Sequence, residues 1–116
     1  MTPRQGSVWR VDIPADVKRG RPVVVVSRED MNRGSDVLII PTYTSNLSAK
    51  RGKPSYVFLP RGTGGLPEDC VAQAAHIHMV EVSELRDEMG VLDIRYMGEI
   101  VRALGWMMQA DCRLAY

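Results

Sequence analysis

The sequence predicts a mainly β fold, a small β-barrel with a C-terminal amphipathic helix packed across it. Short runs of β-branched and other apolar residues recur through most of the chain and are separated by Gly, Pro and polar turns, which is typical of barrels and sandwiches. Apolar residues at helical spacing gather near the C-terminus. With 116 residues, 45% of them hydrophobic, the chain has the length of a single domain, which we expect to span residues 1–116.

Five or six short strands are expected before residue 81. The first lies within residues 6–13, and the second, 21–27, is a run of valines that predicts burial on both faces of a sheet. Pro22 fits only the start of that strand, because proline cannot donate a ladder hydrogen bond. A third strand covers 37–41 and continues extended to 46, a fourth covers 56–59, and one or two more fall within 70–80.

One amphipathic helix is expected at the C-terminus. Asp93 is a suitable N-cap, because its carboxylate can accept a hydrogen bond from a free N–H of the first turn. Trp106 lies off the apolar stripe of this helix, which favours a position facing a partner protein. The stripe consists of residues at spacings of three and four, namely Ile94, Met97, Val101, Leu104 and Met108.

Composition and motifs exclude several function classes. No apolar run approaches the ~20 residues of a membrane span, and the first residues lack the apolar core of a secretory signal, so we expect a cytoplasmic protein without membrane contact. The two cysteines, Cys70 and Cys112, form neither a disulfide framework nor a zinc-binding pattern. Motifs for phosphate-binding loops and serine hydrolases are absent. We therefore expect no metal and no cofactor.

Polar and basic side chains gather at the expected strand ends and loops. The net charge of +1 at pH 7 is the balance of +6 in residues 1–65 and −5 in residues 66–116. This asymmetry indicates a surface that faces a polyanion, although chance clustering of solvated charges explains it equally well. The residue types are those that contact phosphates and bases in nucleic-acid complexes, and they are Arg21, Asn32, Arg33, Tyr43, Thr44, Ser45, Asn46, Lys50, Arg51 and Lys53.

The order of five motifs is more specific than any one of them. Along the chain come Gly-x-Val-Trp-x-Val-Asp at 6–12, Arg-Pro-Val-Val-Val-Val-Ser at 21–27, Asn-Arg at 32–33, Ile-Pro-x-x-Thr-Ser-Asn-Leu at 40–47 and Gly-Leu-Pro-Glu-Asp-Cys-Val at 65–71. In this order they resemble the MazF/PemK family of toxin endoribonucleases over nearly the whole chain. The resemblance implies an SH3-like barrel of the CcdB/MazF type and a homodimer. It also implies metal-independent, sequence-specific cleavage of single-stranded RNA, and inhibition by an antitoxin protein.

The resemblance further implies roles for individual residues. Arg21 matches the family's catalytic arginine, Thr44 its catalytic threonine, and the Asn32-Arg33 pair is expected to line the RNA site. In such cleavage the 2′-hydroxyl attacks the adjacent phosphorus, leaving a 2′,3′-cyclic phosphate and a 5′-hydroxyl. A guanidinium can stabilise charge on that phosphate, but an arginine with a pKa of ~12.5 or more is a poor proton donor. The remaining expected RNA-binding residues are Ser45, Asn46, Lys50 and Arg51.

The chain departs from the family pattern at His76-Ile77-His78-Met79, where relatives usually carry Gln-[Ile/Val]-Arg-Thr. The two histidines lie two residues apart, so on a strand they would share a face. Three interpretations are open: a general acid–base pair, two ligands of a metal without an evident third, or structural hydrogen bonding. Two alternatives to the nuclease are also open, an inactive barrel that binds RNA or a peptide, and a CcdB-like gyrase-poisoning toxin.

Overall fold

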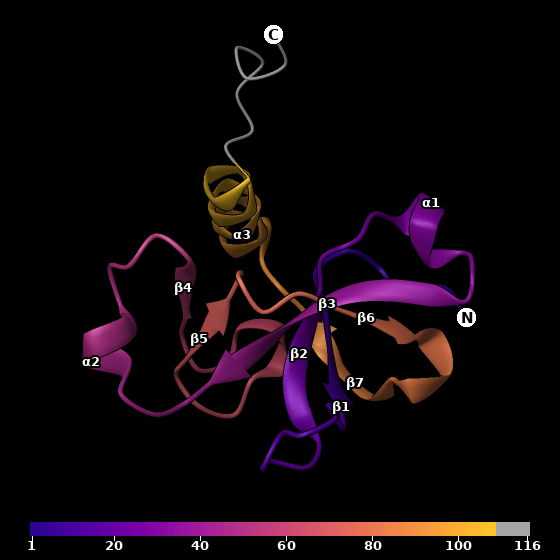
Figure 1. Ribbon diagram of the computed structural model, residues 1–116, viewed down its shortest axis with the longest axis horizontal. Coiled ribbons are helices and arrows are strands. Elements are labelled where there is room, and N and C mark those ends of the chain that lie inside the picture. Colours follow the sequence, from indigo (N-terminus) through magenta and orange to yellow (C-terminus); the bar gives the residue numbers. More distant parts are fainter. Residues whose placement is uncertain (109–116) are drawn as a thin grey trace, which may run out of the picture.

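The computed structural model describes residues 1–108, and its core is a strongly bent antiparallel sheet (Figure 1). The seven strands are β1 (Ser7–Val11), β2 (Arg21–Val25), β3 (Asp36–Tyr43), β4 (Tyr56–Leu59), β5 (Cys70–Gln73), β6 (His78–Glu81) and β7 (Arg86–Val91). The helices are α1 (Glu29–Asn32), α2 (Leu47–Lys50) and α3 (Ile94–Met107), with 3₁₀ turns η1 (Thr63–Gly65) and η2 (Val82–Glu84).

The long strand β3 organises the sheet. The strand order is β4-β5-β3-β2-β1-β7, and β6 pairs with β3 off this path. The first half of β3 pairs with β6, from Asp36↔Glu81 to Ile39↔His78, and its last two residues pair with β5. Within residues 1–108 no strand pairing joins β4 to β7, so the sheet curls in the manner of a barrel without closing.

The valine run of β2 is buried on both faces, as its sequence predicts. Val24 packs with Val8 in a core that also includes Ile100 of α3. Val23 and Val25, on the opposite face of the strand, belong to a second core on the side of β6 and η2. This double burial positions the first residue of β2 rigidly against β3, and that residue is the arginine of the candidate site.

Helix α3 covers one face of the sheet, but not with the stripe that its spacing predicts. Asp93 caps the helix as expected, accepting a hydrogen bond from the backbone N–H of Arg95. The fully or nearly buried positions are Ile100 and Ala103. The predicted stripe is therefore wrong in part: Ile94, Val101 and Met108 are 86%, 52% and 68% exposed, because apolar residues surround much of this helix and the sheet covers the side of Ile100. Trp106 is 60% exposed.

Three elements lack a sequence signal. Strand β7 has no alternating pattern. Within residues 1–108 it pairs with β1 alone, three of its six residues are exposed and the other three are partly buried. Helices α1 and α2 have four residues each and lie in the segments that we expected to be loops. Cys70 is buried and reduced, whereas Cys112 lies outside the described residues. No helix in the described part of the chain is both long and apolar enough to span a membrane.

Candidate functional site

Arg21 is a buried arginine with unused hydrogen-bonding capacity. It opens β2 and is only 9% exposed. Its Nη1 donates to the carbonyl of Thr42 at 2.9 Å, while Nε and Nη2 donate to the carboxylate of Asp16. Three of the five guanidinium N–H groups are thereby used, and one N–H on each of Nη1 and Nη2 has no partner among the described residues. These two N–H groups are free to donate to an anion.

Asp16 holds the guanidinium from the loop between β1 and β2. Its two oxygens accept from Arg21 at 2.5 and 2.8 Å. The loop reaches this position through Ala15, which has a left-handed φ of 66°. The hydrogen bonds from Arg21 lower the pKa of Asp16 from 3.8 to about 2, and the same contact raises the pKa of Arg21. Our sequence analysis missed Asp16. The feature that indicates it is an acidic residue five positions before an arginine that begins a buried strand.

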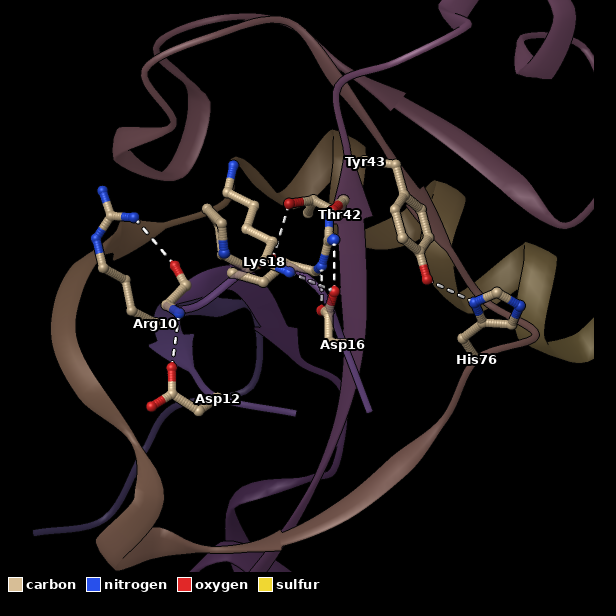
Figure 2. A network of polar contacts seen from close by, with 10 residues as sticks. Arg10, Asp12, Asp16, Lys18, Thr42, Tyr43 and His76 are labelled. Atoms are coloured by element: carbon tan, nitrogen blue, oxygen red, sulfur yellow. Dashed lines mark hydrogen bonds and ion pairs between the residues drawn. The ribbon is translucent and has the colours of Figure 1, made fainter. Parts of the chain in front are cut away.

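Tyr43, the last residue of β3, forms the neighbouring wall. The guanidinium carbon of Arg21 lies 4.7 Å from the centre of its ring, and Nζ of Lys50 on α2 lies 4.9 Å from it. A hydrogen bond of 2.7 Å joins the Tyr43 hydroxyl to Nδ1 of His76, and the two rings meet edge to face (Figure 2). Burial raises the pKa of Tyr43 above its usual value of 10.

An open depression of about 400 Å³ lies over these groups. Arg21, Asp16, Tyr43 and His78 line it, together with apolar residues of the β1–β2 loop. His78 is the first residue of β6, whereas His76 lies in the turn before that strand. The two histidines therefore do not share a strand face, and they contribute differently: His78 lines the depression, and His76 bonds to Tyr43.

Thr44 lies in a different depression from Arg21. The register Val23↔Pro41, continued to the strand ends, places Arg21 opposite Tyr43, and successive residues of a strand point to opposite faces. Thr44 accordingly lines a small cavity of about 40 Å³ on the other side, with Thr42, Lys18 and Arg10 among its neighbours. Arg21 and Thr44 therefore line separate depressions in this conformation.

The burial of Asn32 is a correction to the sequence analysis. Asn32 is fully buried, and its amide is bonded to the Ser27 hydroxyl, the Ser27 carbonyl and the carbonyl of Pro3. A side chain without exposed surface cannot line an RNA site, so this expectation is wrong for the conformation described. Arg33 is exposed and paired with Asp30, just past α1, which follows the opposite end of β2 from Arg21 (Figure 1).

The remaining expected RNA contacts divide between two regions. Ser45 and Asn46 are exposed in the turn after β3, where Asn46 has a left-handed φ of 53° and precedes α2. Lys50 lies over Tyr43 beside the Arg21 depression. Arg51 instead stacks on Phe58 at 3.8 Å and lines a separate depression with Trp106. In residues 1–108, no three His, Cys, Asp or Glu side chains are grouped as a metal site.

Comparison with known proteins shows to which protein family this chain belongs. The model of the PemK-like, MazF-like toxins of type II toxin–antitoxin systems matches residues 4–108. Endoribonuclease MazF9 of Mycobacterium tuberculosis is 32% identical over 110 residues, covering 87% of this chain and 92% of that protein. Endoribonuclease MazF6 of the same species is 30% identical over 84 residues, which are 72% of this chain and 74% of the relative.

Solved structures show the same fold. A mycobacterial endoribonuclease in complex with its cognate antitoxin is similar at a TM-score of 0.79 and 24% identity, over 94% of this chain and 97% of that one. A MazE–MazF structure from Deinococcus radiodurans is similar at a TM-score of 0.74 and 19% identity, over 96% of this chain and 100% of that one. The predicted fold class, a CcdB/MazF-type barrel with a C-terminal helix, is thereby confirmed.

Proposed function

The chain belongs to the PemK-like, MazF-like toxin family of type II toxin–antitoxin systems, and we propose that it is an endoribonuclease that cuts single-stranded RNA without a metal ion. Its curated relatives carry the name endoribonuclease, and they match most of this chain. The relative solved with its cognate antitoxin supports an antitoxin as the protein partner here. We further propose that the toxin acts as a homodimer on cytoplasmic RNA at specific short sequences.

The observation that carries the mechanism is the pair of unused N–H groups on the Arg21 guanidinium. Its two remaining N–H groups belong to a buried side chain that Asp16 and the Thr42 carbonyl hold in place. A phosphodiester in the adjacent depression can accept both hydrogen bonds, one on each non-bridging oxygen. Because the donors are fixed before the substrate arrives, they stabilise the charge that develops on phosphorus oxygens at little reorganisation cost.

The reaction that fits this arrangement is an internal transesterification. The 2′-oxygen of the ribose attacks the adjacent phosphorus, and the bond from phosphorus to the 5′-oxygen breaks. One proton leaves the 2′-hydroxyl and one proton must reach the departing 5′-oxygen. The products are a 2′,3′-cyclic phosphate and a 5′-hydroxyl. Arg21 supplies charge stabilisation in this scheme rather than the proton, since its pKa is raised further by Asp16.

Basic side chains around the strand ends offer a path for the rest of the RNA strand. Lys50 lies beside the Arg21 depression, and Lys18 and Arg10 line the cavity that contains Thr44. We propose that the phosphate next to the scissile one binds on the Thr44 side. The two depressions would then hold neighbouring phosphates of one strand, with Thr44 contributing a hydroxyl donor.

The test is cleavage of a long single-stranded RNA by the purified protein in the presence of EDTA. We expect cuts whose upstream fragments carry a 2′,3′-cyclic phosphate and whose downstream fragments carry a 5′-hydroxyl. Arg21→Ala should abolish cleavage. Since this change leaves the Asp16 carboxylate unpaired, the double variant Asp16→Asn/Arg21→Ala should be measured alongside it, with Arg33→Ala as the matched surface control. Binding of RNA without cleavage by the wild type would instead support an inactive RNA-binding barrel.

A further inference from the structure

The proposed reaction requires a proton donor for the leaving 5′-oxygen, and Arg21 is a poor one. Tyr43 is a neighbouring side chain that can take this role. It lines the same depression as Arg21, and its ring centre lies 4.7 Å from the guanidinium carbon. Its hydroxyl is bonded to Nδ1 of His76 at 2.7 Å. Tyr43 thus carries an exchangeable proton on a ring that lines the depression where the phosphate would bind.

We propose that Tyr43 donates the proton to the 5′-oxygen and that His76 returns a proton to Tyr43. This inference rests on the proposed function. Tyr43 would be a catalytic residue, because its hydroxyl touches the leaving group, and His76 would act through Tyr43. The assignment differs from a role for the two histidines as one acid–base pair, since His78 has no hydrogen bond to Tyr43 in the described structure.

The surroundings of Tyr43 suit a donor. Two cations, the guanidinium of Arg21 and the ammonium of Lys50, lie over its ring and restrict its orientation. The phenol is half buried, and burial keeps its pKa above the usual value, so the hydroxyl is protonated at neutral pH. His76 is exposed, which gives its other ring nitrogen access to water for proton exchange. The two groups therefore form a short path from solvent to the depression.

Atoms and charges balance along this path. As the bond between phosphorus and the 5′-oxygen breaks, its electron pair stays on the oxygen, which takes the proton of the Tyr43 hydroxyl. The Tyr43 oxygen takes the Nδ1 proton of a protonated His76. His76 later regains a proton from water, and the 2′-hydroxyl proton is released to water during the attack. The net result is transfer of one proton from the 2′-oxygen to the 5′-oxygen.

The experiment compares two substrates in single-turnover assays. One is an RNA oligonucleotide with a normal linkage at the cleavage site, and the other has sulfur in place of the bridging 5′-oxygen. A thiolate leaving group has a conjugate-acid pKa of ~8.5 and departs without protonation. Tyr43→Phe keeps the ring under both cations but removes the proton. We expect the Tyr43→Phe variant to cleave the normal linkage about 100-fold more slowly than wild type. On the sulfur linkage its rate should be within about threefold of the wild-type rate.

Controls separate a chemical role from a structural one. Tyr96→Phe on α3, whose hydroxyl bonds to Arg95 outside this depression, should leave both rates unchanged. His76→Gln should slow cleavage of the normal linkage by about tenfold. On the sulfur linkage this variant should also regain a rate close to that of the wild type. Equal losses of Tyr43→Phe on the two substrates, or wild-type rates on both, would overturn the proton-donor role while leaving the nuclease function intact. A wild-type protein that cuts neither substrate would overturn both proposals.

Discussion

The Asp16 carboxylate binds the Nε and Nη2 edge of the Arg21 guanidinium, with oxygen–nitrogen distances of 2.5 and 2.8 Å. This is the edge through which arginine commonly makes a forked contact with an anion. Because Asp16 occupies it, only the second N–H groups of Nη1 and Nη2 remain for another acceptor. The pair therefore holds the Arg21 guanidinium in place and limits the N–H groups that an anion can use.

The first prediction concerns stability and pH. Asp16 has a pKa of about 2 in the folded protein and 3.8 ordinarily, so its ionised form stabilises the fold. This contribution is present above pH 4 and is lost as the pH falls toward 2. We expect Asp16→Asn to lower the free energy of unfolding by about 2 kcal/mol at pH 7. Urea unfolding at pH 7, 4 and 2.5 measures this effect. The difference in free energy of unfolding between wild type and Asp16→Asn should become smaller as the pH falls.

A control for this prediction is the exposed pair of Asp30 and Arg33, whose side chains are more than two-thirds exposed. Surface ion pairs contribute little to stability. Asp30→Asn should therefore leave the unfolding midpoint close to that of wild type at every pH. A constant difference between wild type and Asp16→Asn from pH 7 to pH 2.5 would contradict the assignment.

The second prediction concerns the geometry of Arg21. Arg21→Lys keeps a positive charge but cannot bond to Asp16, the Thr42 carbonyl and a phosphate in the same directions. We expect the rate constant of cleavage to fall by 10²–10³-fold, as is typical of losing a fixed donor to developing charge, ~3–4 kcal/mol. The concentration of RNA for half-maximal rate should change little. Full activity with lysine would show that charge alone suffices.

The sequence predicted those features of the fold that depend on the residue types of one short segment. The valine run of β2 requires burial on both faces, and β2 is buried at every position. The Arg-Pro pair predicted the start of this strand, and Arg21 is its first residue. The Asp93 cap of α3 was likewise readable from its residue type.

Sequence reasoning failed where the environment of a side chain depends on distant backbone. Asn32 has the residue type of an RNA contact, but Ser27 and the carbonyl of Pro3 take its amide into the interior. The position of Asp16 depends on a loop with a left-handed Ala15, which no periodic pattern encodes. The contact of Tyr43 with His76 joins residues 33 apart in the chain. The roles of these groups therefore emerge only from the folded structure.

The third prediction concerns Asn32. Removing its amide takes away the acceptor of the Ser27 hydroxyl proton and the side-chain donor to the carbonyls of Pro3 and Ser27. We expect Asn32→Ala to lower the free energy of unfolding by about 2–4 kcal/mol, while cleavage below the unfolding transition stays at the wild-type rate. Thermal unfolding and a cleavage assay at low temperature measure the two effects. A stable variant with weakened RNA binding would restore Asn32 as an RNA contact.

The fourth prediction concerns the glycine-rich loop around η1. A Cβ atom on Gly65, which has a φ of +74°, would lie 2.0 Å from the carbonyl oxygen of Met89 in β7. Gly62 also has a positive φ, but nothing lies within 4 Å of its Cβ position. Gly62→Ala should therefore cost only the backbone strain, about 1–3 kcal/mol. Gly65→Ala should cost at least ~2 kcal/mol more, because β7 must shift. Equal unfolding midpoints for the two variants would contradict this packing.

The fifth prediction concerns Thr44, which lies with Lys18 and Arg10 rather than with Arg21. If it holds the neighbouring phosphate, Thr44→Ala removes binding that is equal in the ground state and the transition state. We then expect the RNA concentration for half-maximal rate to rise severalfold, with the maximal rate nearly unchanged. Lys18→Ala should raise the same RNA concentration. Its effect should become smaller with added salt, because the contact of Lys18 with a phosphate is ionic.

The opposite result for Thr44→Ala would be equally informative. A loss of maximal rate comparable to that of Arg21→Lys, without weaker binding, would mean that both side chains act on the scissile phosphate. The β1–β2 loop and the end of β3 would then have to close around the RNA, because the two side chains line separate depressions in the free protein. Single-turnover rates measured over a range of protein concentrations separate binding from cleavage and distinguish these two arrangements.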